Sequence, residues 1–330
     1  MSFSRYNTED SVISAETVVR PMWTSDTYTL STFATASNST EYYLDVYQTA
    51  SSATNAEVQF DIQYGNINGS GSAPINPSIA GYSPSRTVYG QYRNLVFGTE
   101  NTYFSFDNYA TTASDIYAIN ISRNRYKQSI QPGTFNLSLK SGSATINLTD
   151  DSNTTSLTRF IGENKVFYII SGSNGNAYTS SAAATYYGVM LPDLGVVILN
   201  ASGTLSPYIQ VPSQATSSVY NHTKLYNSIS SSAATNVAGT GFKAQSQEVI
   251  SSRYFFTRVK NSEFNYTSNP SIIDDNGNLL YTTLIDNPQT YVTTVGMYND
   301  NNELVAVAKL SKPLTKDFTK EALIRIKLDY

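Results

Sequence analysis

The sequence has no cysteine, one histidine and few charges: 14% of its 330 residues are Asp, Glu, Lys or Arg. Ordinary globular chains carry about 25%. The absence of cysteine excludes a disulfide framework, a cysteine-based zinc site and a thiol nucleophile. A net charge of −4 argues against general nucleic-acid binding, which needs many cations to neutralise phosphates. No apolar stretch is long enough to span a bilayer, so neither nucleic acid nor membrane is an expected partner.

Aromatic and small polar residues dominate what is present. The chain contains 26 Tyr and 14 Phe, and 40% of its residues are apolar. Aromatic and β-branched side chains suit pleated surfaces, whereas Asn, Ser and Gly suit turns. This composition predicts a mostly β protein, built from antiparallel sheets or β-sandwich-like domains with long loops and few short helices.

Alternating patterns locate the strands. The segments 57–64, 134–140 and 322–330 alternate, which predicts strands with one apolar face. The segment 144–150 follows 134–140 after a turn, so these two predict a hairpin, and 291–298 with 304–310 predict a second hairpin. In the segment 322–330, Ala322, Ile324, Ile326, Leu328 and Tyr330 share the apolar face. The continuous apolar runs 165–171 and 194–200 predict strands buried on both faces. The Asn276-Gly277 dipeptide predicts a type I′ turn.

One segment differs from the rest in composition. Large apolar residues thin out between 206 and 245, where Ser, Ala and Thr accumulate. We therefore divide the chain into an N-terminal β region at 1–205, a linker or long loop at 206–245, and a C-terminal β region at 246–330. Helix signals are thin, and the segment 222–230 could begin a short helix.

Signatures of catalysis are weak. His222 falls in the predicted linker, which favours a solvated loop histidine over a catalytic base or metal ligand. The sequence-adjacent pairs Asp150-Asp151 and Asp274-Asp275 are better explained as turn residues, because neighbouring side chains on a strand point to opposite faces. No phosphate-binding loop or nucleophile elbow is present. We expect no enzymatic activity, no cofactor and no metal site.

Two features suggest contact surfaces. Arg123, Arg125 and Lys127 alternate, which on a strand would place three cations on one face, either to meet an acidic partner or to protect a solvated edge. Tyr and Phe occur on both faces of several predicted strands, and Tyr is prominent in protein interfaces. The interface candidates are Arg123, Arg125, Tyr126, Tyr254, Phe256, Ile324, Ile326, Leu328 and Tyr330. Exposed Tyr would also suit a sugar-binding platform.

The C-terminal block carries a resemblance. Val295-Gly296-Met297-Tyr298-Asn299-Asp300, then Leu304 to Ala308, Pro313 and Ile324 to Leu328, resemble a segment of tail-fibre and baseplate proteins of tailed bacteriophages. The stretches 82–98, 114–142, 148–153, 186–200 and 251–270 are similar to a virion structural protein of T4-like phages, including those of marine bacteria.

This resemblance implies a non-enzymatic virion protein, with a baseplate or tail position as the first choice and neck, head and fibre positions left open. Its partners would be other virion proteins, with the chain itself forming a homo-oligomer or ring. It would assemble in the reducing host cytoplasm, where packing and subunit contacts replace disulfides. The alternative is a receptor- or glycan-binding tail-fibre or adhesin module.

Overall fold

The computed structural model describes residues 5–36, 42–71, 83–106, 112–155, 159–201, 203–210, 220–233, 241–265 and 269–329. Strands hold 46% of these residues and helices hold 15%, so the prediction of a mostly β chain with antiparallel sheets and few short helices is confirmed. The chain divides into two compact units. Unit 1 comprises Met1–Glu16 and Val249–Tyr330, and unit 2 comprises Thr17–Glu248.

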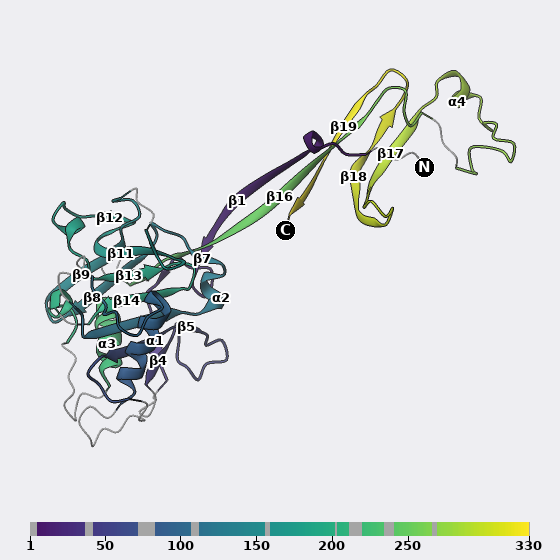
Figure 1. Cartoon of the computed structure of the whole chain (residues 1–330). Coiled ribbons are helices and arrows are strands. Elements are labelled where there is room, and N and C mark those ends of the chain that lie inside the picture. Colours follow the sequence, from purple (N-terminus) through teal and green to yellow (C-terminus); the bar gives the residue numbers. More distant parts are fainter. Residues whose placement is uncertain are drawn as a thin grey trace. The chain divides into compact units, whose positions relative to one another are not determined.

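Unit 2 is organised around one large antiparallel sheet (Figure 1). Its strands follow in space as β2 (Thr29–Leu30), β15 (Phe242–Lys243), β8 (Asn136–Ser141), β9 (Ala144–Asp150), β11 (Asn164–Ser173), β13 (Gly188–Leu191), β14 (Val196–Asn200), β6 (Asp115–Ile121), β5 (Val58–Asn66), β4 (Tyr43–Tyr47) and β3 (Ala34–Thr35). Two short strands, β10 (Arg159–Ile161) and β12 (Asn176–Ala177), pair with β11. The predicted segment 206–245 falls within this unit.

The strands predicted from alternation form this sheet. β8 and β9 make the expected hairpin, in which Gly142 adopts the left-handed φ of 59° that its tight turn needs. Phe135, Leu137 and Leu139 are fully buried, as their spacing predicts. The two continuous apolar runs become β11 and β14, which lie in the interior of the sheet order with neighbours on both sides.

A helix explains how so wide a sheet closes on itself. α3 (Asn221–Ala233) contacts both β8 and β5, although five other strands separate these two in the sheet order. The sheet must therefore curl around the helix, which places Leu225 and Ile229 of α3 in the main apolar cluster. A segment with helical potential was predicted here, and the structure confirms a helix of 13 residues.

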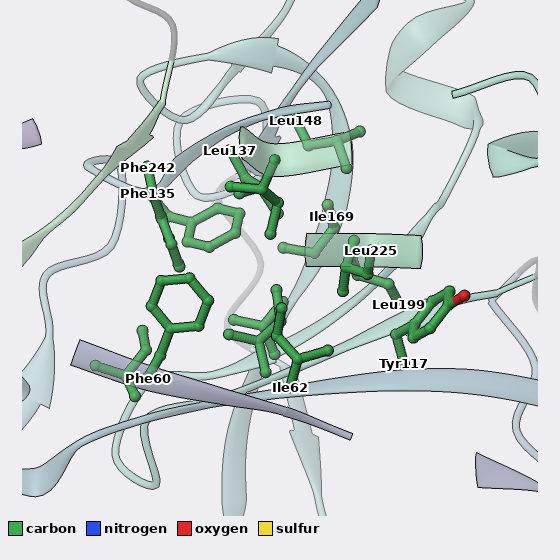
Figure 2. Packing of buried hydrophobic residues seen from close by; sticks show 14 of the residues in the cluster. Phe60, Ile62, Tyr117, Phe135, Leu137, Leu148, Ile169, Leu199, Leu225 and Phe242 are labelled. Atoms are coloured by element: carbon green, nitrogen blue, oxygen red, sulfur yellow. The ribbon is translucent and has the colours of Figure 1, made fainter. Parts of the chain in front are cut away.

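Aromatic rings join the two ends of the curled sheet (Figure 2). Phe242 of β15 lies 5.3 Å from Phe60 of β5, measured between ring centroids, and Trp23 contacts both rings at 4.8 and 6.2 Å. Tilted and edge-on aromatic pairs of this kind add about 0.5–1.5 kcal/mol each beyond the area that they bury. Figure 2 shows Phe60, Phe135 and Phe242 beside the aliphatic side chains that fill the inside of the curl.

The opposite face of the sheet carries a second apolar cluster. α1 (Ser85–Phe97) covers it with Val88, Tyr89, Tyr92 and Val96. A Cβ at Gly65 of β5 would lie 2.8 Å from the backbone nitrogen of Tyr89, so this close approach of helix and strand requires glycine. α1 was not predicted.

His222 differs from the sequence-based expectation. It lies on α3, is 2% exposed, and its Nε2 has no hydrogen-bond partner, whereas a solvated loop histidine was predicted. The physical reason is helical spacing: His222, Leu225 and Ile229 fall on one face, and that face packs into the curl of the sheet. Burial lowers the pKa of the His222 imidazole from 6.5 to about 4.

This burial predicts a pH dependence of stability. The folded chain keeps His222 neutral down to about pH 4, whereas the unfolded chain protonates it near pH 6.5. The contribution of His222 to the free energy of unfolding should therefore fall by roughly 3 kcal/mol as the pH drops from about 6.5 to about 4. Because the sequence has one histidine, a single imidazole NMR signal reports its titration directly.

The matched variant is His222→Leu, whose unfolding free energy should lose this component of the pH slope between pH 4 and 6.5. An imidazole signal that titrates near pH 6.5 in the folded wild type would contradict the buried placement.

Candidate assembly interface

Unit 1 contains the last strand of the chain, which is β19 (Ala322–Asp329). It pairs antiparallel with β16 (Gln245–Val259). Ile324 and Ile326 are 6% exposed and Leu328 is half-buried, whereas Arg325, Lys327 and Asp329 are exposed. The predicted alternation of this strand is confirmed, and Tyr330 lies outside the described residues. β16 also borders β1 (Ser11–Pro21). The first residues of β16 belong to unit 2, where Ser246 and Gln247 pair with β7 (Ser129–Ile130).

The inner face of this sheet is assembled from distant parts of the sequence. Phe255 and Thr257 of β16 face the same side as Ile326 and Ile324, with which they pair. Tyr6 covers them: its ring centroid lies 5.5 Å from that of Phe255, and its hydroxyl lies 2.5 Å from Thr257 Oγ1. The N-terminal segment therefore completes a small apolar layer around the C-terminal strand.

The opposite face carries the other predicted interface residues. Tyr254 pairs with Lys327, and Phe256 pairs with Arg325, so both aromatic side chains lie on the charged face of β19. Both are half-buried, and the Arg325 guanidinium lies 5.5 Å from the Tyr254 ring centroid. The structure thus brings five of the predicted interface residues together in one sheet, divided between its two faces.

The second element of unit 1 is a two-stranded hairpin (Figure 1). β17 (Thr290–Tyr298) pairs with β18 (Leu304–Lys316), which confirms the predicted hairpin. The pairing is interrupted between Val292 and Thr294, where residues 310–313 of β18 have no Cα partner. Two strands alone are at best marginally stable in water. The hairpin therefore needs further contacts to hold its shape.

Exposed apolar side chains concentrate in unit 1. Its described residues contribute only three buried apolar side chains to the chain's core: Val259, Ile324 and Ile326. In the same unit the large apolar residues that remain exposed are Tyr6, Val12, Ile13, Val249, Phe264, Leu280, Tyr281, Ile285, Tyr291, Tyr298, Leu304, Val305, Val307, Leu314, Phe318 and Leu323. Unit 2 is more than twice as long, and its exposed residues of this kind are Val19, Tyr28, Tyr42, Leu95, Tyr103, Phe160 and Tyr178.

This imbalance defines the candidate site. A single Val or Leu gains about 1.5–3 kcal/mol when it passes from water to a packed interior. Val305 and Val307 of β18 are 69% and 58% exposed, and Tyr291 of β17 is 63% exposed. Val305 and Val307 lie two residues apart on β18, and clustered exposed apolar side chains of this kind are typical of protein contact sites. The sequence predicted the hairpin, but period-two spacing alone does not say whether its apolar residues meet the chain's own core or another chain.

A buried lysine supplies the main polar anchor of unit 1. Lys316 is fully buried, and its Nζ donates to the carbonyl oxygens of Asn261 and Asp317 and to Asn265 Oδ1, at 2.8–2.9 Å. All three of its donors are thereby used. The lysine ties the end of β18 to the turn that follows β16.

The predicted cationic strand face at 122–128 is wrong. The segment forms α2 (Arg123–Tyr126), a single helical turn, so Arg123 and Arg125 do not alternate along a strand. Tyr126 is buried, and the exposed Arg123 donates from Nη1 to its hydroxyl at 3.1 Å. Period-two spacing over so few residues cannot distinguish a strand from one turn of helix.

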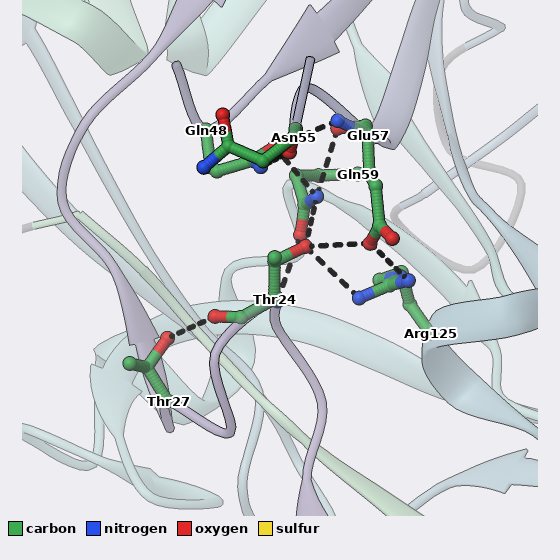
Figure 3. A network of polar contacts seen from close by, with 7 residues as sticks. All are labelled: Thr24, Thr27, Gln48, Asn55, Glu57, Gln59 and Arg125. Carbon is green, nitrogen blue, oxygen red and sulfur yellow. Dashed lines mark hydrogen bonds and ion pairs between the residues drawn. The ribbon is translucent and has the colours of Figure 1, made fainter. Parts of the chain in front are cut away.

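Arg125 takes part in an internal network (Figure 3). Its guanidinium pairs with Glu57 at 2.6 Å and donates to Thr24 Oγ1 at 2.9 Å. The fully buried Gln59 donates to the same Thr24 oxygen at 2.6 Å and to Gln48 Oε1 at 3.1 Å. These contacts fix the segment beside Trp23 within unit 2. The proposed interface role of Arg123, Arg125 and Tyr126 stays a prediction.

The sequence-adjacent carboxylates build turns. Asp150 is buried and accepts from the Gly133 backbone nitrogen at 2.8 Å, and burial raises its pKa. Asp151 instead pairs with Arg159 at 2.5 Å. Asp274 accepts from the backbone nitrogens of two following residues, Asn276 and Asn278, which lower its pKa, Asn278 most.

The type I′ prediction at 276–277 is wrong. In this turn only Gly277 has positive φ, and its nitrogen donates to the Asp274 carbonyl at 3.0 Å, so Asp275 and Asn276 are the central residues. A type I′ turn would need positive φ at both central positions.

Sequence reasoning missed a carboxylate pair across strands. The register of β4 and β5 places Asp45 directly opposite Asp61. Asp61 accepts from Asn120 Nδ2 at 2.7 Å and from Gln63 Nε2 at 3.0 Å, and burial, with Asp45 as a smaller cause, raises its pKa. Only the register brings these two residues together. Among the described residues, no three His, Cys, Asp or Glu side chains form a group that could hold a metal ion.

No protein-family model, curated protein or solved structure matches the chain. Within the described parts of the chain, no helix has the length and apolar character needed to cross a bilayer.

The Lys316 anchor yields a prediction. In Lys316→Met the oxygen atoms of Asn261 and Asn265 lose a charged donor, which costs about 1–3 kcal/mol when such groups stay buried. The turn after β16 should open more often, so trypsin should cleave after the exposed Lys260 several-fold faster, as measured by mass spectrometry of the fragments.

The control is Lys312→Met, which removes an exposed lysine from the same strand and should leave the cleavage rate unchanged. Equal cleavage rates in both variants would show that Lys316 does not anchor this turn.

Proposed function

We propose that the chain is a non-enzymatic structural component of a tailed-bacteriophage virion, most consistent with a baseplate or tail subunit. The observation that carries the proposal is the exposed apolar surface of unit 1, which has almost no core of its own. The resemblance of the C-terminal block to tail-fibre and baseplate proteins supports the same assignment. Its partners would be other virion proteins, and it would assemble in the host cytoplasm.

The physical argument starts from the contrast between the units. Unit 2 buries its apolar residues on both faces of the curled sheet and fits the properties of an independently folded domain. Unit 1 presents a hairpin and a three-strand sheet segment, and many of their apolar side chains face water in the isolated chain. Contact with another subunit would bury this surface, and the gain per side chain is comparable to that in a protein core. An assembly component uses such surface, whereas a solitary monomer is destabilised by it.

The particle itself provides the test. Antibodies raised against the purified chain should label the tail or baseplate of intact phage particles in immunogold electron microscopy. Mass spectrometry of gradient-purified particles should detect the chain at a constant ratio to the major tail protein. Unlabelled particles that lack the chain would contradict the proposal. Saturable binding of the purified chain to a glycan array at micromolar concentration, with no labelling of particles, would favour the receptor-binding alternative.

Deletion of residues 320–330 gives a second prediction. The truncation removes β19 and with it the buried Ile324 and Ile326, which leaves Phe255 and Thr257 without their strand partners. The truncated chain should fail to enter particles when it replaces the wild-type chain during infection, as measured by its abundance in purified virions. Normal incorporation of the truncated chain would count strongly against a structural role for this sheet.

A further inference from the structure

The two edges of the unit 1 hairpin differ in chemistry. β17 has the sequence TYVTTVGMY, with no charged residue and no proline. β18 carries Lys309, Lys312 and Pro313, and residues 310–313 bulge out of the pairing. Lysine, proline and bulges are the features by which proteins block an exposed strand edge from pairing with another strand. The edge of β18 is therefore protected, and the edge of β17 is not.

Among the described strands, β17 pairs only with β18, so the other edge of residues 291–297 presents a row of backbone donors and acceptors. The strand is nine residues long, and Thr293 and Thr294 at its centre are exposed. A long, uncharged, unpaired edge is the arrangement that recruits another strand.

We propose that β17 pairs antiparallel with β17 of a second copy of this chain, which joins two hairpins into one four-stranded sheet. This inference rests on the proposed structural role and names the partner of unit 1. Because β17 has no charged residue, two copies of it can pair without bringing like charges together. Two copies of β18 that paired with each other would instead bring their lysines close together, and like charges repel.

Symmetry fixes the register. A two-fold axis perpendicular to the sheet leaves every side chain on the face where it started. Residues that lie opposite each other in a strand pair share a face, so their numbers differ by an even number. The two-fold axis therefore passes beside one residue, which lies opposite the same residue of the other copy. Full overlap of β17 puts Thr294 on the axis and places Tyr291 of each copy opposite Met297 of the other. Cross-strand Thr–Thr pairs are favourable, and a Met sulfur beside an aromatic ring adds a further attraction.

The pairing also addresses the instability of the isolated hairpin. Four strands form an independently stable sheet far more readily than two. Tyr291 is 63% exposed in the single chain, and a neighbouring strand would cover it without rearranging β18.

The decisive experiment uses the residue on the axis. Thr294→Lys places two lysines opposite each other in the dimer, and Thr294→Asp places two carboxylates there. Each variant of the full-length chain should lose at least tenfold in dimer affinity by analytical ultracentrifugation. An equimolar mixture of the two should dimerise again, because lysine then faces aspartate across the axis.

Matched controls are Ser311→Lys and Ser311→Asp, at an exposed position on β18, which should dimerise like the wild type. A wild-type chain that stays monomeric at tens of micromolar would overturn the pairing, and so would Thr294 variants that dimerise as well as the Ser311 variants. A mixture that fails to restore dimers while both variants show wild-type circular dichroism would do the same.

A cysteine variant covers the case in which the charged variants fold poorly. The chain has no native cysteine, so Thr294→Cys introduces a unique thiol. Mild oxidation should link it into covalent dimers far faster than Ser311→Cys, and equal rates would overturn the proposal. If the wild type is monomeric, the β17 pairing is wrong, and particle labelling still tests the virion role. If the chain dimerises but is absent from particles, the virion role is wrong and the β17 pairing stands.

Discussion

Hydrophobic burial is distributed unevenly along this chain, and the rest of its behaviour depends on that distribution. Unit 2 closes a wide sheet around α3 and seals the curl with Trp23, Phe60 and Phe242. Unit 1 buries three apolar residues and leaves many large ones in water. Because burial is the dominant favourable term in folding and association, a unit with few buried apolar residues has more stability to gain from contact with another surface than a unit with a complete core.

The main polar networks of the two units stabilise different kinds of structure. In unit 2 the network of Arg125, Glu57, Thr24 and Gln59 fixes a loop against a core that is already complete. In unit 1 the fully buried Lys316 orders a turn in a unit that has few buried apolar side chains. Since an unmet donor or acceptor costs more than a made bond gains, these contacts specify geometry more than they supply net stability.

The sequence predicted the strands well because their period of two reflects a physical contrast between a wet and a dry face. The alternation of β8 and β19 followed from it, and the intervening turns predicted the hairpins β8–β9 and β17–β18. α1 was missed although Val88, Tyr89, Tyr92 and Val96 have helical spacing, because tyrosine favours strands and the surrounding composition did too. His222 was misjudged for a related reason: a segment rich in Ser and Ala resembles a linker in composition, yet its few apolar residues share one helical face.

Other features could not be predicted at all. The Asp45–Asp61 pair depends on strand register, and the position of Trp23 between β15 and β5 depends on how the sheet curls. The exposure of Val305 and Val307 depends on which surfaces the chain leaves uncovered, and an alternating pattern is the same for a core and for an interface.

Amide hydrogen exchange, measured on the free chain and on the assembled protein, distinguishes a unit 1 that is completed by another chain from one that is stable alone. If unit 1 is completed by another chain, amides of 290–316 exchange fast in dilute free chain and slowly in the assembly, whereas the strands of unit 2 are protected in both. Strong protection of 290–316 in the dilute monomer, equal to that of unit 2, would show that unit 1 needs no other chain.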